Sequence, residues 1–359
     1  MLKAGVKLGL KVRANLKRGT SMIAANPLRL TTSKYDRDTF AQGEQQGAAL
    51  IIVLVVTSLV AIAAVTVSEQ TQLRIYLTQN QRDSLQAKRY LQAAESHAIL
   101  LLQAAIKEPT VHLQQSWANG RSDFEIDNGQ LSIDITDQRS CLNLNMMADQ
   151  IEQRAGQGLL SKDVAQLKYL MAELNISAAI QNLFIYRLKD WVDPDSERSD
   201  PYGEEDAFYL NAEPAYLAAD AALAGLDELA LLQVDMKQLS VMFPFVCVLP
   251  VGSGNRINLN TVLQPELLVA LSNGLFDRSQ AQSIINSRPE QGYQSLAEFI
   301  NVQEESLRPA IAAMPLTLSS SFFRADLKVS YGRSLKQRSV FIRFEGDNAQ
   351  VYKRVNKDG

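Results

Sequence analysis

Acidic side chains are densest in one stretch, DWVDPDSERSDPYGEEDAFYL, which runs from Asp190 to Leu210. Eight carboxylates surround two prolines and one glycine there, namely Asp190, Asp193, Asp195, Glu197, Asp200, Glu204, Glu205 and Asp206. Calcium takes about six to eight oxygen ligands in flexible geometry, and a loop bent by proline and glycine can wrap alternate carboxylates around one ion. The spacing does not match the EF-hand pattern. From these residues alone, a calcium site and a solvated acidic loop both remain open.

Other kinds of chemistry find little support in the sequence. His97 and His112 share no motif with a nucleophile or a ligand cluster, and we interpret both as structural. The chain has no Gly-x-Ser-x-Gly motif and no P-loop, and no histidine lies near the acidic stretch. A membrane-anchored metal hydrolase is therefore disfavoured, and we expect a protein that is not an enzyme.

The formal charge of −3 hides an asymmetry along the chain. Residues 1–47 carry nine Lys and Arg against three Asp and Glu, whereas the remainder carries 27 against 36. Affinity for nucleic-acid phosphates comes mainly from Lys and Arg. The acidic body therefore argues against a nucleic-acid partner.

Twenty residues without a charge, Ala48 to Val67, follow the basic segment directly after Gly47. At about 1.5 Å per residue such a helix spans roughly 30 Å, the thickness of a bilayer core. The positive-inside bias places the N-terminus in the cytoplasm and residues 68–359 outside it. Because no Gly or Pro occurs from Ala48 until Pro109, the pattern predicts one helix of about 60 residues, half in the membrane and half outside.

Strand patterns flank a long helical middle. SDFEIDNGQLSIDITDQ, Ser122 to Gln138, alternates apolar and polar residues around Asn-Gly and predicts two strands joined by a tight turn. FFRADLKVSYGR, QRSVFIRFEG and AQVYKRV predict three more strands near the C-terminus, and residues 150–318 between the groups are rich in Leu and Ala at helical spacing. The simplest architecture is a head with a helical domain inserted into it. Chain order alone does not establish that the two strand groups share a sheet.

A weak internal echo appears inside the helical middle, where CLNLN ends at Asn145 and RINLN ends at Asn260. After the second instance we expect a helix, a turn at Gly274, a second helix, a turn at Gly292 and Tyr293, and a third helix. This order resembles a helix-hairpin-helix or SAM-like unit. Such units often grip DNA, but this segment has few basic residues and lies outside the cytoplasm, so we interpret it as a packing unit.

The N-terminal pattern resembles that of type IV pilins and pseudopilins, in which a glycine directly precedes a chargeless helix that continues as an amphipathic stem. The resemblance implies that a prepilin peptidase cuts between Gly47 and Ala48, and that Ala48 is then N-methylated. Most members carry a Glu at the fifth mature position, where this chain has Ile52. In lacking a Glu at this position, the chain resembles the K-type minor pseudopilins.

The acidic stretch resembles the signature of the general secretion pathway protein K family, the minor pseudopilin of the type II secretion system, in its blocks DWVDPDSE and GEEDAFYL. CLNLN, INLNT and GYQSLAEF are similar to that family as well, so the resemblance runs from Gly47 to roughly the C-terminus. It implies a calcium-binding head. The ligand roles it implies fall on Asp193, Asp195, Glu205 and Asp206, with Glu204 in place of the usual Ala.

The two cysteines, Cys141 and Cys247, form no C-x-x-C pair. A disulfide between them is open if the body is exported. The resemblance makes that bridge the expectation, because each cysteine lies near an Asn-Leu-Asn element and the implied compartment is oxidising. Two buried thiols remain the alternative.

The resemblance implies an α+β fold with a long N-terminal transmembrane and stem helix, a pilin-like head with an antiparallel β-sheet, and a large inserted all-α domain. The expected boundaries are a removed basic leader 1–47, a transmembrane segment 48–67, a periplasmic stem helix 68–108, the first part of the head 109–148, an inserted helical domain 149–318 with the acidic loop 190–210, and C-terminal strands 319–359.

The implied function is that of a minor pseudopilin at the pseudopilus tip, initiating or capping the filament that exports folded proteins across the outer membrane. The chain would be a single-pass protein of the bacterial inner membrane with its head in the periplasm, and calcium would be its cofactor. Expected partners are the minor pseudopilins I and J, other pseudopilins, the inner-membrane secretion platform and the prepilin peptidase. The alternatives are a type IV pilus minor pilin and a calcium-dependent periplasmic binding module.

Overall fold

The computed structural model describes residues 45–146, 162–199 and 201–358. Residues 1–44 of the expected leader, residues 147–148 of the expected first part of the head and residues 149–161 of the expected inserted domain lie outside this description. The chain divides into two compact units, one ending at Glu69 and the other beginning at Gln70.

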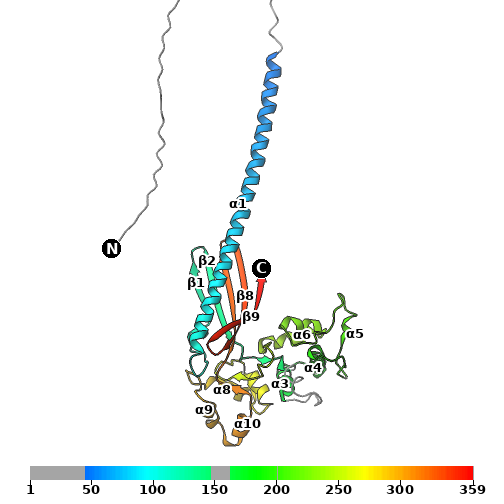
Figure 1. The fold of residues 1–359 in the computed structure, drawn as a ribbon, viewed down its shortest axis with the longest axis vertical. Coiled ribbons are helices and arrows are strands. Elements are labelled where there is room, and N and C mark those ends of the chain that lie inside the picture. Colours follow the sequence, from blue (N-terminus) through cyan, green and yellow to red (C-terminus); the bar gives the residue numbers. More distant parts are fainter. Residues whose placement is uncertain (1–44, 147–161, 200, 359) are drawn as a thin grey trace, which may run out of the picture. The chain divides into compact units, whose positions relative to one another are not determined.

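The long N-terminal helix predicted from the sequence is present. α1 spans Gln45–Ala105, 61 residues (Figure 1). Within the first unit, the hydroxyls of Thr57, Ser58 and Thr66 donate to carbonyl oxygens three residues earlier, so these polar groups are satisfied inside the helix. Among the described residues, α1 is the one helix long and apolar enough to cross a membrane, and the 18-residue window that qualifies it has a mean hydropathy of 3.0. The chain therefore has a segment suited to single-pass anchoring.

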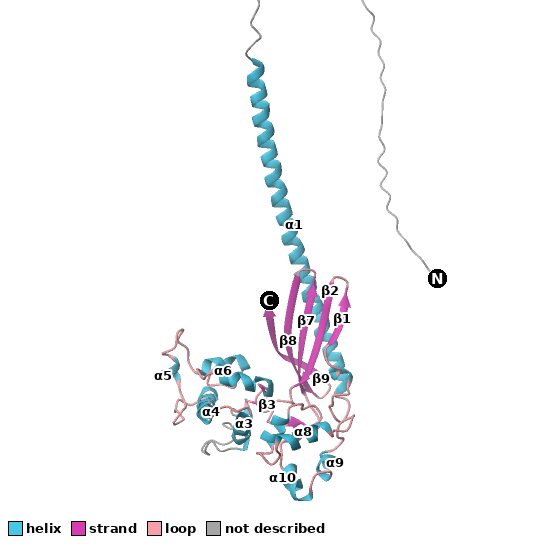
Figure 2. Ribbon diagram, turned by 180° about the vertical axis from the view of Figure 1, so that it is seen from behind, coloured by secondary structure: helices cyan, strands magenta, loops and turns pink. Residues whose placement is uncertain are grey.

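Five strands form one antiparallel sheet, shown in magenta in Figure 2. They are β1 Ser122–Ile126, β2 Gly129–Asp137, β7 Phe322–Tyr331, β8 Ser334–Glu345 and β9 Asn348–Asp358, in the order β1-β2-β7-β8-β9. The hairpin predicted around Asn128 and Gly129 is present, with its two-residue turn at Asp127 and Asn128 and with Gly129 opposite Ile126 as the first residue of β2. β2 pairs with β7 along its whole length, from Gly129 opposite Tyr331 to Asp137 opposite Phe323. The two strand groups therefore share one sheet.

The C-terminal part of α1 lies against one face of this sheet (Figure 2). Its buried face consists of small and branched residues, Ala87, Leu91, Ala94, Ala98, Leu102 and Ala105. Small side chains let the helix approach the strands closely, where alternate residues such as Ile133 and Phe323 form the core. Glu95 fixes the helix to the sheet by accepting hydrogen bonds from Arg354 and lying 3.5 Å from Arg338.

The helical insertion occupies the chain between β2 and β7, as expected. Its described helices are α3 Lys162–Glu173, α4 Ala178–Val192, α5 Asp206–Tyr209, η2 Leu226–Leu232, α6 Met236–Leu239, η3 Ser240–Phe245, α7 Pro265–Leu271, α8 Arg278–Asn286, α9 Leu296–Asn301, η4 Glu305–Leu307 and α10 Arg308–Ala312. The predicted turns at Gly274 and Gly292 separate α7, α8 and α9. Assignment of this unit as SAM-like or helix-hairpin-helix stays a prediction.

The insertion is not purely helical, which corrects the all-α expectation. β3 Leu142–Asn143 pairs in parallel with β4 Val246–Cys247, and β5 Ile257–Asn258 pairs in parallel with β6 Leu316–Thr317. Strands of two residues are too short to give a periodic signal. The two pairs divide the insertion into two halves, each of which begins and ends at one pair.

The first half begins with an asparagine clamp. Asn143 Oδ1 accepts from the N–H of Asn145 at 3.1 Å, which shapes the turn after β3. The Asn145 side chain hydrogen-bonds both backbone groups of Leu223: it donates to the carbonyl oxygen and accepts from the N–H, at 2.9 Å each. One side chain therefore ties the start of this half to a loop far along the chain.

The second half repeats the clamp with different residues. Asn258 Oδ1 accepts from the N–H of Asn260 at 3.0 Å. Asn260 donates to the carbonyl oxygen of Tyr293 at 3.0 Å and accepts from its N–H at 2.8 Å. The weak echo between CLNLN and RINLN therefore corresponds to one repeated local structure.

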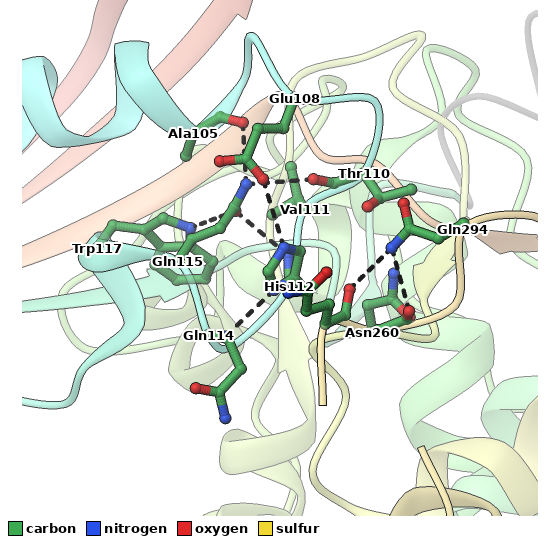
Figure 3. Close-up of polar contacts among 12 residues, drawn as sticks. Ala105, Glu108, Thr110, Val111, His112, Gln114, Gln115, Trp117, Asn260 and Gln294 are labelled. Carbon is green, nitrogen blue, oxygen red and sulfur yellow. Dashed lines mark hydrogen bonds and ion pairs between the residues drawn. The ribbon is translucent and has the colours of Figure 1, made fainter. Parts of the chain in front are cut away.

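A polar joint connects the end of α1 to the rest of the second unit, and Figure 3 shows it centred on Gln115 and His112. Gln115 Nε2 donates to the carbonyl oxygens of Ala105 and Thr110, and its Oε1 accepts from the indole N–H of Trp117 at 2.8 Å. These bonds satisfy a carbonyl that the helix end leaves open. His112 accepts a backbone N–H on Nδ1 and lies 3.4 Å from Glu108, in keeping with the structural role expected for it.

Asp137 fixes the insertion to the sheet at the end of β2. Its carboxylate is 2 % exposed and accepts from Asn258 Nδ2 at 2.9 Å, from Thr261 Oγ1 at 2.6 Å and from the N–H of Arg139 at 2.7 Å. Burial raises the pKa of Asp137, and the hydrogen-bond donors act in the opposite direction. The same Asn258 side chain donates to the carbonyl oxygen of Val111, so the joint and the insertion meet at one buried amide.

Candidate metal centre

The acidic stretch begins on the last turn of α4. The apolar face of this helix, including Phe184, Leu188 and Trp191, packs into the largest core of the insertion. That packing buries Asp190 fully and leaves Asp193, the residue after the helix, 2 % exposed. A helix C-terminus carries partial negative charge, so carboxylates are unfavourable there unless a cation offsets them.

Three of the four predicted ligands come together. Asp193, Asp195 and Glu205 each offer a carboxylate oxygen, and these three oxygens lie within 4.8 Å of one another. Asp206 stands apart at the start of α5, where its Oδ1 accepts from the N–H of Ala218 at 2.9 Å. Its ligand role stays a prediction.

Buried carboxylate oxygens around this cluster lack hydrogen-bond donors. Among the described residues, Asp190 Oδ1, Asp193 Oδ1 and Glu205 Oε1 are buried without a partner. Such atoms cost free energy unless a donor or a cation meets them. Lys189 gives only partial compensation, because its Nζ lies 3.8 Å from Asp193 Oδ2 and donates instead to Ser199 Oγ at 2.6 Å.

The electrostatics of the cluster favour a proton or a cation. Burial and then the charge of Asp195 raise the pKa of Asp193 to about 6. Burial and then the charges of Asp190 and Asp193 raise the pKa of Glu205 to about 7. Carboxylates this close repel one another when all are ionised.

Two acidic residues near the cluster were not assigned as ligands from the sequence. Asp190 has a pKa raised by burial, and its Oδ2 accepts from the N–H of Ser199 at 2.9 Å. Asp220 adds to the repulsion felt by both Asp193 and Glu205, and it has a positive φ of 47°. Asp220 lies ten residues beyond the acidic stretch, as a lone Asp among alanines. No motif or spacing there indicates that it would lie near the cluster.

The donor set fits a hard divalent cation. Its atoms are carboxylate oxygens, several without partners, and the chain that carries them is bent around prolines and Gly203. Calcium prefers oxygen ligands of this kind in irregular geometry, whereas the softer transition metals favour His and Cys. The residues present therefore fit calcium.

The cysteines close the first half of the insertion. Cys141 and Cys247 form a disulfide in the structure, with Cα atoms 5.7 Å apart and a sequence separation of 106. The bridge is buried in a small cluster with Leu249 and Phe322. It lies beside the parallel pair of β3 and β4, so the covalent bond and the strand pair close the same half.

The fold defines an α+β protein with one helix suited to a membrane span and a head that carries a two-part insertion. Models of the family described as "Type II secretion system (T2SS), protein K" match residues 140–251 and 257–319. These matches coincide with the two halves of the insertion. The chain belongs to the type II secretion system protein K family, whose members are structural components of that secretion system.

Known relatives cover almost the same length. The type II secretion system protein K of Klebsiella pneumoniae is 31 % identical over 321 residues, 86 % of this chain and 96 % of the relative. The corresponding protein of Aeromonas hydrophila is 29 % identical over 323 residues, 87 % of this chain and 97 % of the relative.

A solved structure has a similar fold. It is a chain in the crystal structure of the GspK-GspI-GspJ complex from the type 2 secretion system of enterotoxigenic Escherichia coli. The TM-score is 0.67 at 26 % identity, over 79 % of this chain and 99 % of that chain.

Proposed function

We propose that this protein is the minor pseudopilin that assembles with the I and J minor subunits at the tip of the type II pseudopilus. The observation that carries the proposal is the similarity to a chain solved in a complex named for K, I and J. Family membership supports a role in export. In this role the protein initiates or caps the filament and catalyses no reaction.

The topology of the head supports a position at the filament end. The insertion leaves the sheet after Asp137 and returns at Phe322, so its bulk projects from one end of two neighbouring strands. Subunits stacked helically along a filament have limited room for such bulk, whereas an end position tolerates it. Ile52 supports the same assignment, because it offers no carboxylate to the N-terminal amine of a neighbouring subunit.

The proposal includes processing and orientation of the membrane segment. A prepilin peptidase would cut between Gly47 and Ala48 and methylate Ala48, leaving the helix anchored in the inner membrane with the head in the periplasm. Gly47 lies in the first turns of α1, and a Cβ placed on it would meet no atom within 4 Å. The basic charge of the leader supports this orientation.

Assembly gives a direct test of the tip position. The full-length chain is expected to co-purify from detergent-solubilised membranes with the I and J minor subunits. Antibody against its insertion should label one end of isolated pseudopili, while antibody against the major subunit labels the shaft as a control. Labelling along the shaft would contradict the tip position, and failure to co-purify with I and J would favour a type IV pilus minor pilin or an unrelated periplasmic binding module.

Calcium binding is the second part of the proposal. Asp193, Asp195 and Glu205 would hold the ion, and Asp206 stays a candidate ligand. Bound calcium supplies two positive charges that offset the mutual repulsion of the carboxylates. These residues come from the end of α4 and from the loop before α5, so the ion would link these two segments.

Calcium should raise the melting temperature of the full-length chain, and the rise should be larger at pH 8 than at pH 5. In the folded protein the pKa values of Asp193 and Glu205, about 6 and about 7, lie above their usual values near 4. Stability of the metal-free protein therefore falls as pH rises from about 4 through about 7, because both groups lose protons that the fold favours. Bound calcium offsets this loss of stability at high pH, where the carboxylates are ionised. At low pH calcium must compete with protons for the same carboxylates, so it stabilises the protein less.

The measurement compares protein stripped of metal with the same protein after calcium addition, at each pH in detergent. The double variant Asp193→Asn/Glu205→Gln is the control and should show no calcium effect at either pH. If the wild-type protein had the same melting temperature with and without calcium at pH 8, the proposed calcium site would be wrong.

A further inference from the structure

Gly203 lies buried in the turn that closes the acidic loop. Its N–H donates to the carbonyl oxygen of Ser199 at 2.7 Å, and the N–H of Ser199 donates to Asp190 Oδ2 at 2.9 Å. A Cβ on Gly203 would overlap both Asp190 Oδ2 and the Ser199 carbonyl oxygen. The φ of Gly203 is not positive, so this position needs a small residue for space and not for a left-handed backbone.

The turn determines where one of the clustered carboxylates lies. Asp193 and Asp195 follow directly from the end of α4, whereas Glu205 comes from the far side of the loop, two residues after Gly203. The hydrogen bonds through Ser199 join that far side to Asp190 on α4. If the backbone at Gly203 moved away from Asp190, Glu205 would move away from the other two carboxylates.

The site holds a second sign of a ligand besides the acidic cluster. Asp190 and Asp193 are 0 % and 2 % exposed, and within the described part of the chain the Oδ1 atom of each has no hydrogen-bond partner. A fold that closes tightly over unpaired carboxylate oxygens is stable when a cation pairs with them.

We propose that Gly203 is a positioning residue of the cation site: its missing Cβ lets the turn from Ser199 close on the Asp190 carboxylate, and this closure brings Glu205 to Asp193 and Asp195. The inference rests on the proposed calcium site and assigns a cause to its geometry. Gly203 touches no ion, and it acts through Asp190 and Glu205.

Calcium affinity separates this role from a general contribution to folding. Gly203→Ala should weaken calcium binding by about tenfold or more, because residues that orient ligands typically cost that much when changed. Binding is measured by titrating calcium into full-length protein in detergent at pH 8, and melting temperatures are recorded with and without calcium. A purely structural role would lower both melting temperatures equally and leave the affinity unchanged.

Gly252→Ala is the matched control. Gly252 has a φ of +78° with open space around its missing Cβ, so alanine strains the backbone there without a clash. This variant should melt at a lower temperature but bind calcium with wild-type affinity.

Asp190→Ala is the second variant, for the case in which Gly203→Ala does not fold. It removes the acceptor for Ser199 without adding an atom, and it also removes a buried charge, so the metal-free protein should fold. Its calcium affinity should again fall by about tenfold.

Affinities within about twofold of wild type for folded Gly203→Ala or for Asp190→Ala would overturn the positioning role while leaving the calcium site in place. If wild-type protein bound no calcium, the proposed calcium site would fail first, and that result is distinguishable from the others.

Discussion

Removing the disulfide between Cys141 and Cys247 is expected to lower the free energy of unfolding of the second unit by about 4 to 5 kcal/mol. A cross-link across a separation of 106 residues removes much of the loop entropy of the unfolded chain. The double variant Cys141→Ala/Cys247→Ala tests this in guanidinium titrations of the full-length chain in non-ionic detergent, with calcium present throughout. Both cysteines are small, so the variant loses little packing.

Reductant provides the control for the disulfide. It should reproduce the loss in the wild-type protein and leave the double variant unchanged. The bridge would contribute nothing to stability if reductant left the denaturation midpoint of the wild-type protein unchanged and if the double variant had that same midpoint.

Asp137→Ala is expected to cost about 3 kcal/mol, because three donors, two of them buried, would lose their acceptor at once. The loss should fall on the attachment of the insertion to the sheet, since two of the donors, Asn258 and Thr261, lie beyond β2 in the second half. Thermal and guanidinium unfolding of the full-length chain measure it.

Asp134→Ala is the matched control for this substitution. Asp134 lies on the same strand, but its side chain is exposed, so its removal should change stability by no more than about 0.5 kcal/mol. Similar losses in the two variants would mean that the network around Asp137 adds nothing beyond an ordinary surface carboxylate.

Much of the fold was predictable from local patterns. The chargeless run after Gly47 and the absence of Gly and Pro until Pro109 correctly predicted α1, and the alternation around Asn128 and Gly129 correctly predicted the first hairpin. These features depend on residues close in sequence. The pairing of β2 with β7 was not predictable, because it joins segments separated by the whole insertion.

The candidate site was predictable only in part, for a related reason. Asp193, Asp195 and Glu205 belong to one dense acidic stretch, which composition alone left open as a calcium site or a solvated loop, and the family resemblance then pointed to these residues as ligands. The role of Asp190 depends on burial against the core, and the approach of Asp220 depends on how a distant loop folds back. Gly203 has the sequence context of an ordinary loop glycine, and only the folded structure brings it against the Asp190 carboxylate.

The pairing of Asp137 with Phe323 has a consequence for the topology of this head. These two residues are register partners at one end of β2 and β7, and the N–H of Gln138 donates to the carbonyl oxygen of Phe322 at 2.9 Å. A tight reverse turn could close the sheet at that point with nothing inserted. The helical half of the protein is thus topologically an accessory at a hairpin tip: the strand order and pairing of the sheet would be the same without it, and the buried contacts of Asp137 with Asn258 and Thr261 attach it to the sheet.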